Sequence, residues 1–216
     1  KFKLLQITTM SFKTKGYLIV KKAISEEVAK LAYNYLLIKR NALAHMFENK
    51  YLAPFEHIHG TWDDDQVRGT YSVYADSFME TLLLYLKPLM IKKTKLKLYE
   101  CYSYARTYKP GDVLKKHKDR MSCEISTTMA LGGDDWPIYL EPSGKKGMKG
   151  IKGIKVDLKP GDMLIYKGCD LEHWREPFKG EVCVQTFLHY STDKNLLRDN
   201  RPMIGLNSDF SRSNKN

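Results

Sequence analysis

The chain has 216 residues, of which 43% are hydrophobic and 12% aromatic, with a formal net charge of +11 and a pI of about 9.3. This composition excludes a globally disordered protein, and no apolar run of about 18 residues is present to span a membrane. We therefore expect a single domain over residues 1–216, without membrane association and located in the cytoplasm.

Helical patterns dominate the first 94 residues. A short buried strand is expected at 16–22. Ser25 is a good N-cap, followed by Glu26 and Glu27 in the first turn, and apolar residues then recur at helical spacing, which predicts a helix over 26–48. A second helix is predicted over roughly 77–90, after Asp76.

A polar stretch at 50–75 separates the two predicted helices. It contains His57 and His59, which could bind a metal, although a surface loop that acts as a lid is the favoured interpretation. Residues 1–94 would then supply helical support and this lid.

From residue 95 onward the pattern indicates short strands separated by Pro-Gly-Asp and Gly-Gly-Asp turns. The predicted strands span 96–108, 124–131, 137–140, 154–158, 163–166 and 182–190. Helices followed by many strands predict an α+β fold with a core at 95–190 in the form of a small barrel or double sheet. Residues 191–216 are expected to form a peripheral C-terminal arm.

The basic charge leaves two interpretations open. Nucleic acid or an acidic partner is one, and a lysine-rich, solvated surface is the other. The densest basic cluster has glycine spacers, which favours a loop over a groove-reading helix. It consists of Lys145, Lys146, Lys149, Lys152 and Lys155.

The four cysteines are scattered and include no Cys-x-x-Cys pair, so a zinc ribbon is not supported. This usage fits a reducing compartment better than a disulfide framework.

Three residues suggest a metal site. His117 and Asp119 stand at i and i+2, so on an extended strand they face the same side, and His173 follows far downstream. Two imidazoles and one carboxylate leave one face of a six-coordinate ion open, which suits a non-haem Fe(II) oxygenase. His189 is the rival third ligand, and three unrelated surface residues are the alternative interpretation.

The segments around these residues carry a family resemblance. They read Tyr104-Ala-Arg106-Thr-Tyr108-Lys-Pro-Gly111, His117-Lys-Asp119-Arg120, Cys123-Glu-Ile-Ser126, Pro160-Gly-Asp162 and Glu172-His173-Trp-Arg175-Glu-Pro177. Over residues 95–190 the chain resembles the 2-oxoglutarate and Fe(II)-dependent oxygenases, most closely the prolyl 4-hydroxylase-like branch with its marine bacterial and phage type.

The resemblance implies a double-stranded β-helix (jelly-roll) core with the two N-terminal helices packed on one sheet. It also implies that His117, Asp119 and His173 bind Fe(II), with 2-oxoglutarate as co-substrate, succinate and CO₂ as products, and ascorbate as a further reductant to consider.

One position departs from the prolyl hydroxylase pattern. A Lys or Arg is expected about ten residues after the distal His, to pair with the far carboxylate of 2-oxoglutarate, but Cys183 stands there. Arg106 and Arg175 are the candidate replacements, because an Arg suits a bidentate carboxylate contact. Tyr104 and Tyr108 could donate hydroxyls beside Arg106. Structural ion pairs are the alternative role for both arginines.

The sequence thus favours a dioxygenase that hydroxylates a protein prolyl residue or a small molecule. Two alternatives remain open at this point. One is a non-catalytic, cupin-like jelly-roll that binds metal structurally, and the other is a nucleic-acid demethylase of the same superfamily. A basic adaptor without metal is a further possibility.

Overall fold

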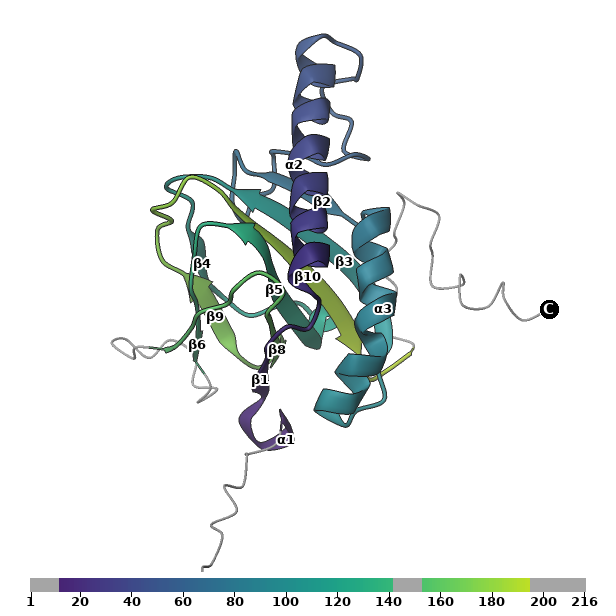
Figure 1. The fold of residues 1–216 in the computed structure, drawn as a ribbon, viewed down its shortest axis with the longest axis vertical. Helices are drawn as coiled ribbons and strands as arrows, with labels where there is room; N and C mark the ends of the chain where they lie inside the picture. Colours follow the sequence, from purple (N-terminus) through teal and green to yellow (C-terminus); the bar gives the residue numbers. More distant parts are fainter. Residues whose placement is uncertain (1–11, 142–152, 195–216) are drawn as a thin grey trace, which may run out of the picture.

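Two antiparallel sheets face each other, and helices cover the outer face of the larger one (Figure 1). The computed structural model describes residues 12–141 and 153–194. Most of the predicted C-terminal arm and the basic residues Lys145, Lys146, Lys149 and Lys152 lie outside these ranges. None of the described helices is both long and apolar enough to cross a bilayer.

The major sheet has six strands in the order β1-β8-β5-β10-β3-β2. Their bounds are β1 Tyr17–Val20, β8 Met163–Lys167, β5 Ile125–Gly133, β10 Cys183–Ser191, β3 Tyr99–Tyr108 and β2 Tyr71–Tyr74. The minor sheet has four strands in the order β4-β9-β6-β7. Their bounds are β4 Leu114–His117, β9 Glu172–Arg175, β6 Ile138–Glu141 and β7 Ile154–Val156. This two-sheet arrangement confirms the predicted α+β jelly-roll.

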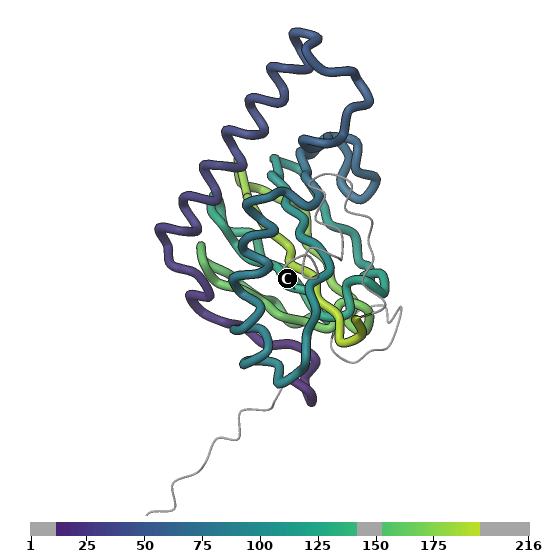
Figure 2. Tube along the Cα trace, turned by 90° about the vertical axis from the view of Figure 1, so that its right-hand side faces the viewer, coloured from purple at the N-terminus to yellow at the C-terminus, as the bar shows by residue number. Residues whose placement is uncertain are grey.

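Two long helices pack side by side against the major sheet, on the side away from the minor sheet (Figure 2). Helix α2 (Glu26–Glu48) begins at Ser25, whose side chain accepts a hydrogen bond from the Val28 amide, and its bounds match the prediction. Helix α3 (Ser77–Thr94) begins at Asp76, which caps the Phe78 and Met79 amides. It runs about four residues past the predicted end and stops at Lys95, which adopts a left-handed conformation (φ 62°).

Successive side chains of a strand point to opposite faces of the major sheet, and the two faces have different surroundings. On β3, Ala105 belongs to the core between the major sheet and the helices, whereas Tyr104 and Arg106 line a cavity on the other face. A second apolar cluster lies between the sheets and includes Leu140 and Leu164. The helices therefore support the back of the sheet whose front carries the site.

Several short elements, including the following three, were absent from the predicted helices and strands. A short helix, α1 (Phe12–Lys15), precedes β1. The stretch predicted as a loop over 50–75 ends in β2, which pairs with β3 as an edge strand. Strand β4 supplies His117 and pairs with β9. Each of these elements has only four residues, too few to show a periodic pattern.

Candidate metal centre

His117, Asp119 and His173 converge on one point. Their candidate ligand atoms all lie within 4.8 Å of one another. Asp119 Oδ1 is 3.7 Å from His117 Nε2 and 3.4 Å from His173 Nε2. The two histidines are directly opposite each other in the β4–β9 pair, with ring centroids 4.2 Å apart. Strand β4 ends at His117, so Asp119 reaches the site from the following loop rather than from the strand itself.

Backbone carbonyls fix the orientation of both imidazoles. His117 Nδ1 lies 2.7 Å from the Lys115 carbonyl oxygen, and His173 Nδ1 lies 3.0 Å from that of Leu171. A carbonyl can only accept, so each Nδ1 carries the proton and each Nε2 presents a lone pair toward Asp119. Burial, reinforced by the neighbouring His173, lowers the pKa of His117 and keeps its ring neutral, as metal binding requires.

Hydrogen bonds fix the position of Asp119. Its amide donates to the Gly168 carbonyl at 2.9 Å, and Ser126 Oγ donates to Oδ2 at 2.7 Å, which leaves Oδ1 facing the histidines. Burial by itself would raise the pKa of Asp119, but its interactions with the His173 imidazole and with the Ser126 hydroxyl outweigh burial and hold the pKa far below its ordinary value. The carboxylate is therefore ionised, and the donor set fits a divalent ion with open positions.

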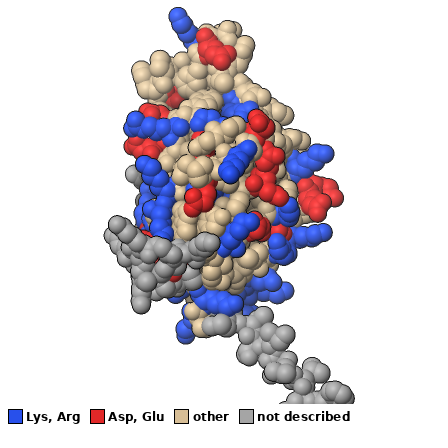
Figure 3. Space-filling model, turned by 90° about the vertical axis from the view of Figure 1, so that its left-hand side faces the viewer, with Lys and Arg blue, Asp and Glu red and all other residues tan. Residues whose placement is uncertain are grey.

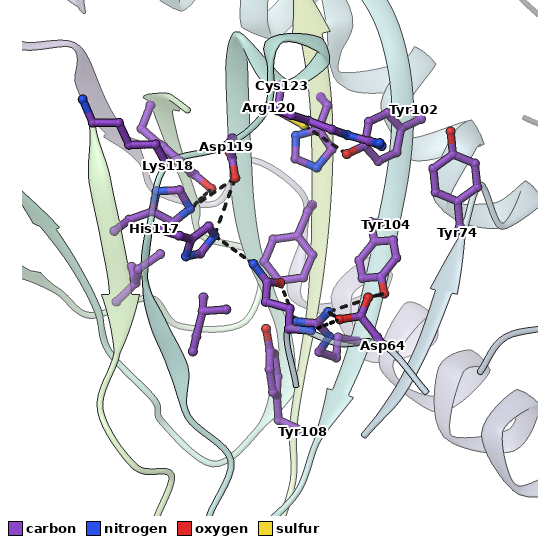
Figure 4. Close-up of a pocket in the computed structure, with 18 residues that line it drawn as sticks. Asp64, Tyr74, Tyr102, Tyr104, Tyr108, His117, Lys118, Asp119, Arg120 and Cys123 are labelled. Atoms are coloured by element: carbon purple, nitrogen blue, oxygen red, sulfur yellow. Dashed lines mark hydrogen bonds and ion pairs between the residues drawn. The ribbon is translucent and has the colours of Figure 1, made fainter. Parts of the chain in front are cut away.

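A cavity of about 410 Å³ lies beside this cluster, between the two sheets. Aromatic side chains from β2, β3 and β10 line one wall (Figure 4). The set consists of Tyr74, Tyr102, Tyr104, Tyr108, Phe187 and His189. Tyr102 packs on both Tyr74 and His189, with ring centroids 4.9 and 4.5 Å apart. The cavity thus joins the metal ligands to a largely aromatic surface.

Part of the predicted lid does reach the site. After α2 the chain passes over one end of the sheets to the side opposite the helices (Figure 2). There the Gln66 side-chain amide contacts His117 Nε2 at 2.9 Å and accepts from Arg106 Nη1 at 3.0 Å. Asp64 forms an ion pair with Arg106 at 2.8 Å and accepts from the Tyr104 hydroxyl at 2.5 Å. Arg106 and Tyr104 are therefore both hydrogen-bonded to side chains of the lid loop.

Asp64 supplies the negative charge in this contact between the loop and Arg106. Burial alone would raise its pKa, but the charge of Arg106 and the Tyr104 hydroxyl lower it overall. Burial, followed by the Asp64 charge, raises the pKa of Tyr104 to about 12 even though Arg106 opposes this. Arg106 is thus engaged in an ion pair, which is the alternative role that the sequence left open for it.

Arg175 lies deeper, on β9 two residues after His173, and is fully buried. Its guanidinium donates to the Trp136 carbonyl and to Thr128 Oγ1, the latter at 3.2 Å, while Nε has no hydrogen-bond partner among the described residues. Burial lowers its pKa, and no carboxylate of the described residues forms an ion pair with it. The nearby Tyr108 hydroxyl, which lines the cavity, also lacks a hydrogen-bond partner in the part of the chain that the structure describes.

Cys183 lies close enough to Arg175 for the two groups to interact electrostatically. Burial raises the pKa of the Cys183 thiol, and the Arg175 charge is the main factor opposing this. Gln185 and Thr128 connect the two residues. The Gln185 amide nitrogen is 3.2 Å from Cys183 Sγ, and the Gln185 side-chain oxygen accepts from Thr128 Oγ1, which in turn accepts from Arg175. The guanidinium of Arg175, on β9, therefore lies close to Cys183, the position on β10 where the prolyl hydroxylase pattern has a Lys or Arg.

His57 and His59 are not part of this centre. No candidate metal group in the described residues includes them. His57 instead lines a second hollow at the end of α2, together with Phe47, Phe55 and Trp62.

Several residues at the centre were not assigned a role from the sequence. Gln66 and Asp64 come from the lid stretch, Ser126 from β5 and Gly168 from the loop after β8. Ser126 had a signal, since it lies in a segment that carries the family resemblance. A Cβ on Gly168 would lie 2.4 Å from Asp119 Oδ2, a constraint visible only in three dimensions.

No family model matches the sequence, and no curated protein is similar to it. Solved structures do match. HygX from Streptomyces hygroscopicus, with nickel and 2-oxoglutarate bound, is 15% identical with a TM-score of 0.56, over 83% of this chain and 84% of that one. A Pseudomonas putida prolyl-4-hydroxylase is 13% identical with a TM-score of 0.54, over 82% and 94%.

A 2OG-Fe(II) oxygenase family protein from Burkholderia pseudomallei is also similar. It is 11% identical with a TM-score of 0.55, over 84% of this chain and 88% of that one. Identities this low establish the fold rather than the activity. The chain has the fold of the 2-oxoglutarate- and Fe(II)-dependent oxygenases, as its motifs predict.

Proposed function

We propose that this protein is an Fe(II)- and 2-oxoglutarate-dependent dioxygenase that hydroxylates a small molecule or a protein prolyl residue, with release of succinate and CO₂. The observation that carries the proposal is the convergence of His117 Nε2, His173 Nε2 and Asp119 Oδ1 at the edge of a cavity. Three protein ligands suit a centre that must keep positions for co-substrate and O₂.

When bound there, ferrous iron supplies O₂ activation coupled to oxidation of the 2-oxo acid. The residues of the chain prepare this chemistry. The carbonyls of Lys115 and Leu171 set the imidazole tautomers, and Ser126 orients Asp119. Asp64 and Gln66 cover part of the site, which supports exclusion of water.

Arg175 is the proposed partner for the far carboxylate of 2-oxoglutarate. It is a buried cation without a carboxylate partner among the described residues, two positions along β9 from His173. A buried charge is costly unless paired, so an incoming carboxylate would relieve that cost. The Tyr108 hydroxyl, which lines the cavity and has no hydrogen-bond partner among the described residues, can add a hydroxyl donor. Arg106, already paired with Asp64, is the weaker candidate.

The aromatic wall supports a substrate with a compact ring. Tyr74, Tyr102, Tyr104 and Phe187 offer flat faces for a saturated ring such as proline or a sugar. HygX is also solved with hygromycin B bound, and a prolyl hydroxylase is among the similar structures. Both similar structures support a small-molecule or prolyl substrate for this protein.

Two observations weigh against the alternatives. A structural metal site normally has four protein ligands, whereas this one offers three beside a cavity. The face that carries the minor sheet has interspersed Lys/Arg and Asp/Glu rather than one sign of charge (Figure 3), with ion pairs such as Lys116–Glu172 and Lys155–Asp157. Such a face gives little support to a nucleic-acid substrate.

The test combines spectroscopy with product analysis. Anaerobic protein with Fe(II) and 2-oxoglutarate should give a weak visible charge-transfer band, and admission of O₂ should yield succinate. His117→Ala and Asp119→Ala should abolish both signals. A wild-type protein that binds Fe(II) but gives neither the band nor succinate would contradict the proposal.

A further inference from the structure

Asp119 also belongs to a second group of candidate metal ligands. Candidate ligand atoms of Asp119, Cys123 and His189 all lie within 4.8 Å of one another. Cys123 ends the short helix η1 (Met121–Cys123), and His189 lies on β10. Both side chains are buried and line the cavity, and neither has a role in the function proposed above. In Figure 4, Cys123 and Asp119 lie on the same side of the cavity.

The chemistry of this second set differs from that of the first. A thiolate, an imidazole and a carboxylate form a donor set typical of Zn²⁺ and other soft d¹⁰ ions, with the fourth position free for water. The first set contains no sulfur and suits Fe(II). The thiolate therefore gives the second set a stronger preference for softer ions than the first set has, while the two sets share one carboxylate.

The surroundings hold these donors in place. The Tyr102 hydroxyl lies 3.0 Å from Cys123 Sγ, and the Tyr102 ring packs on His189. Ser126 Oγ is 2.9 Å from His189 Nδ1 and 2.7 Å from Asp119 Oδ2, so one hydroxyl links the imidazole to the shared carboxylate. The guanidinium of Arg120 lies 5.0 Å from the centroid of the Tyr102 ring.

We propose that Asp119, Cys123 and His189 form a second metal site, specific for a soft divalent cation such as Zn²⁺ or Cd²⁺. Binding forms a metal–sulfur bond, and the thiol proton is released to solvent, with no change of oxidation state. The site is independent of oxygenase chemistry, so it can be tested without turnover.

The experiment uses the full chain, reduced and freed of metal, with Cd²⁺ alone as the probe under anaerobic conditions. The wild type should develop an ultraviolet thiolate-to-cadmium charge-transfer band that saturates with added ion. Cys123→Ser should lose this band. Cys169→Ser is the matched control and should keep it, because Cys169 lies in the loop nearby, where it donates to the Arg120 carbonyl. His189→Gln should shift the titration to higher Cd²⁺ concentration.

A double variant, His117→Ala with His173→Ala, separates the two sets of donors. It should retain the band, because the second set does not include either imidazole. Loss of the band in this variant would mean that Cys123 serves the first centre, and the proposal would be overturned. Absence of the band in the wild type, or its survival in Cys123→Ser, would overturn it as well.

Folding of the variants is checked by circular dichroism. If Cys123→Ser does not fold, ¹¹³Cd NMR of the wild type decides the question. A resonance shifted by one sulfur ligand supports the site, and a spectrum in which every resonance is typical of nitrogen and oxygen ligands alone refutes it.

Discussion

The side-chain amide of Gln66 lies 2.9 Å from His117 Nε2, the nitrogen that also faces Asp119 and His173. His117 Nδ1 carries the proton, so Nε2 has a single lone pair, and the Gln66 amide donates to it. That lone pair cannot accept this hydrogen bond and coordinate an ion at the same time. Metal binding and the contact of the lid loop with His117 are therefore linked.

Replacing Gln66 with Ala should increase metal affinity. The variant removes a hydrogen bond that competes for the lone pair, and a net hydrogen bond contributes about 1 kcal/mol, or roughly fivefold in the dissociation constant. Mn²⁺, which is stable in air, can be titrated by calorimetry. Asp65→Ala is the control in the same loop, because Asp65 pairs only with the exposed Arg68, and it should leave affinity unchanged. A weaker Mn²⁺ affinity in Gln66→Ala would contradict the linkage.

Arg175→Met should impair 2-oxoglutarate binding much more than metal binding. Loss of one partner of a buried charge pair costs about 2–5 kcal/mol, which corresponds to a dissociation constant at least about 30-fold higher. Arg106→Met should have a smaller effect on 2-oxoglutarate, because Arg106 is paired with Asp64. Binding is measured by the visible band of the Fe(II) complex as 2-oxoglutarate is titrated.

A rescue experiment tests whether charge or packing is responsible. Cys183 lies beside Arg175 at the position where the prolyl hydroxylase pattern has a cation. Cys183→Lys in the Arg175→Met background should restore part of the 2-oxoglutarate affinity. If Arg106→Met is instead the more damaging change, the anchor is on β3 and the assignment to β9 is wrong.

The local patterns in the sequence predicted the two long helices well, and the three candidate metal ligands that they singled out lie close together. Ser25 and Asp76 fix the helix starts through capping, which depends on only a few neighbouring residues. The alternation of β3 placed Tyr104, Arg106 and Tyr108 on one face, and all three line the cavity.

What the sequence could not predict was which groups meet across long separations. Asp64 and Arg106 lie 42 positions apart and pair only because the chain after α2 crosses the end of the sheets. The sequence around Arg106 does not show whether this arginine pairs with an aspartate of the loop or is available to bind a ligand. The same limit applies to Arg175, because its sequence neighbours do not reveal that no carboxylate of the described residues pairs with it.

Asp64→Asn should destabilise the protein above about pH 4, and its difference from the wild type should shrink as the pH falls further. The folded-state pKa of Asp64 lies below the ordinary value of 3.8, so its ionised form stabilises the fold at higher pH. That stability is lost as pH falls through the lowered pKa. At pH 7 we expect a loss of about 1–3 kcal/mol, since the carboxylate accepts charge-assisted hydrogen bonds.

Urea unfolding of wild type and Asp64→Asn at pH 7 and pH 3 gives the difference directly. Other carboxylates titrate in both proteins and cancel in that difference. Asp65→Asn, at an exposed pair, should cost little at either pH. A constant difference between Asp64→Asn and wild type across the pH range would show that the charge of Asp64 is not responsible.

Gly168→Ala should weaken both the fold and the metal centre. A Cβ there would lie 2.4 Å from Asp119 Oδ2, 2.4 Å from the Cys123 carbonyl oxygen and 2.6 Å from Ser126 Oγ. The Cys123 carbonyl belongs to the backbone, and the short Asp119 and Ser126 side chains are hydrogen-bonded to each other, so Asp119 must move away from the position that Ser126 gives it. We expect about 1–3 kcal/mol of destabilisation from overpacking and reduced Mn²⁺ affinity.

Gly111→Ala is the control for backbone strain alone, because Gly111 has φ +83° and no atom within 4 Å of an added Cβ. It should lower thermal stability but leave Mn²⁺ affinity unchanged, as Gly111 is remote from the ligands. If Gly168→Ala loses stability while binding Mn²⁺ like the wild type, the metal centre does not depend on the Asp119 position described above. Equal loss of affinity in both variants would assign the effect to general destabilisation rather than to displacement of Asp119.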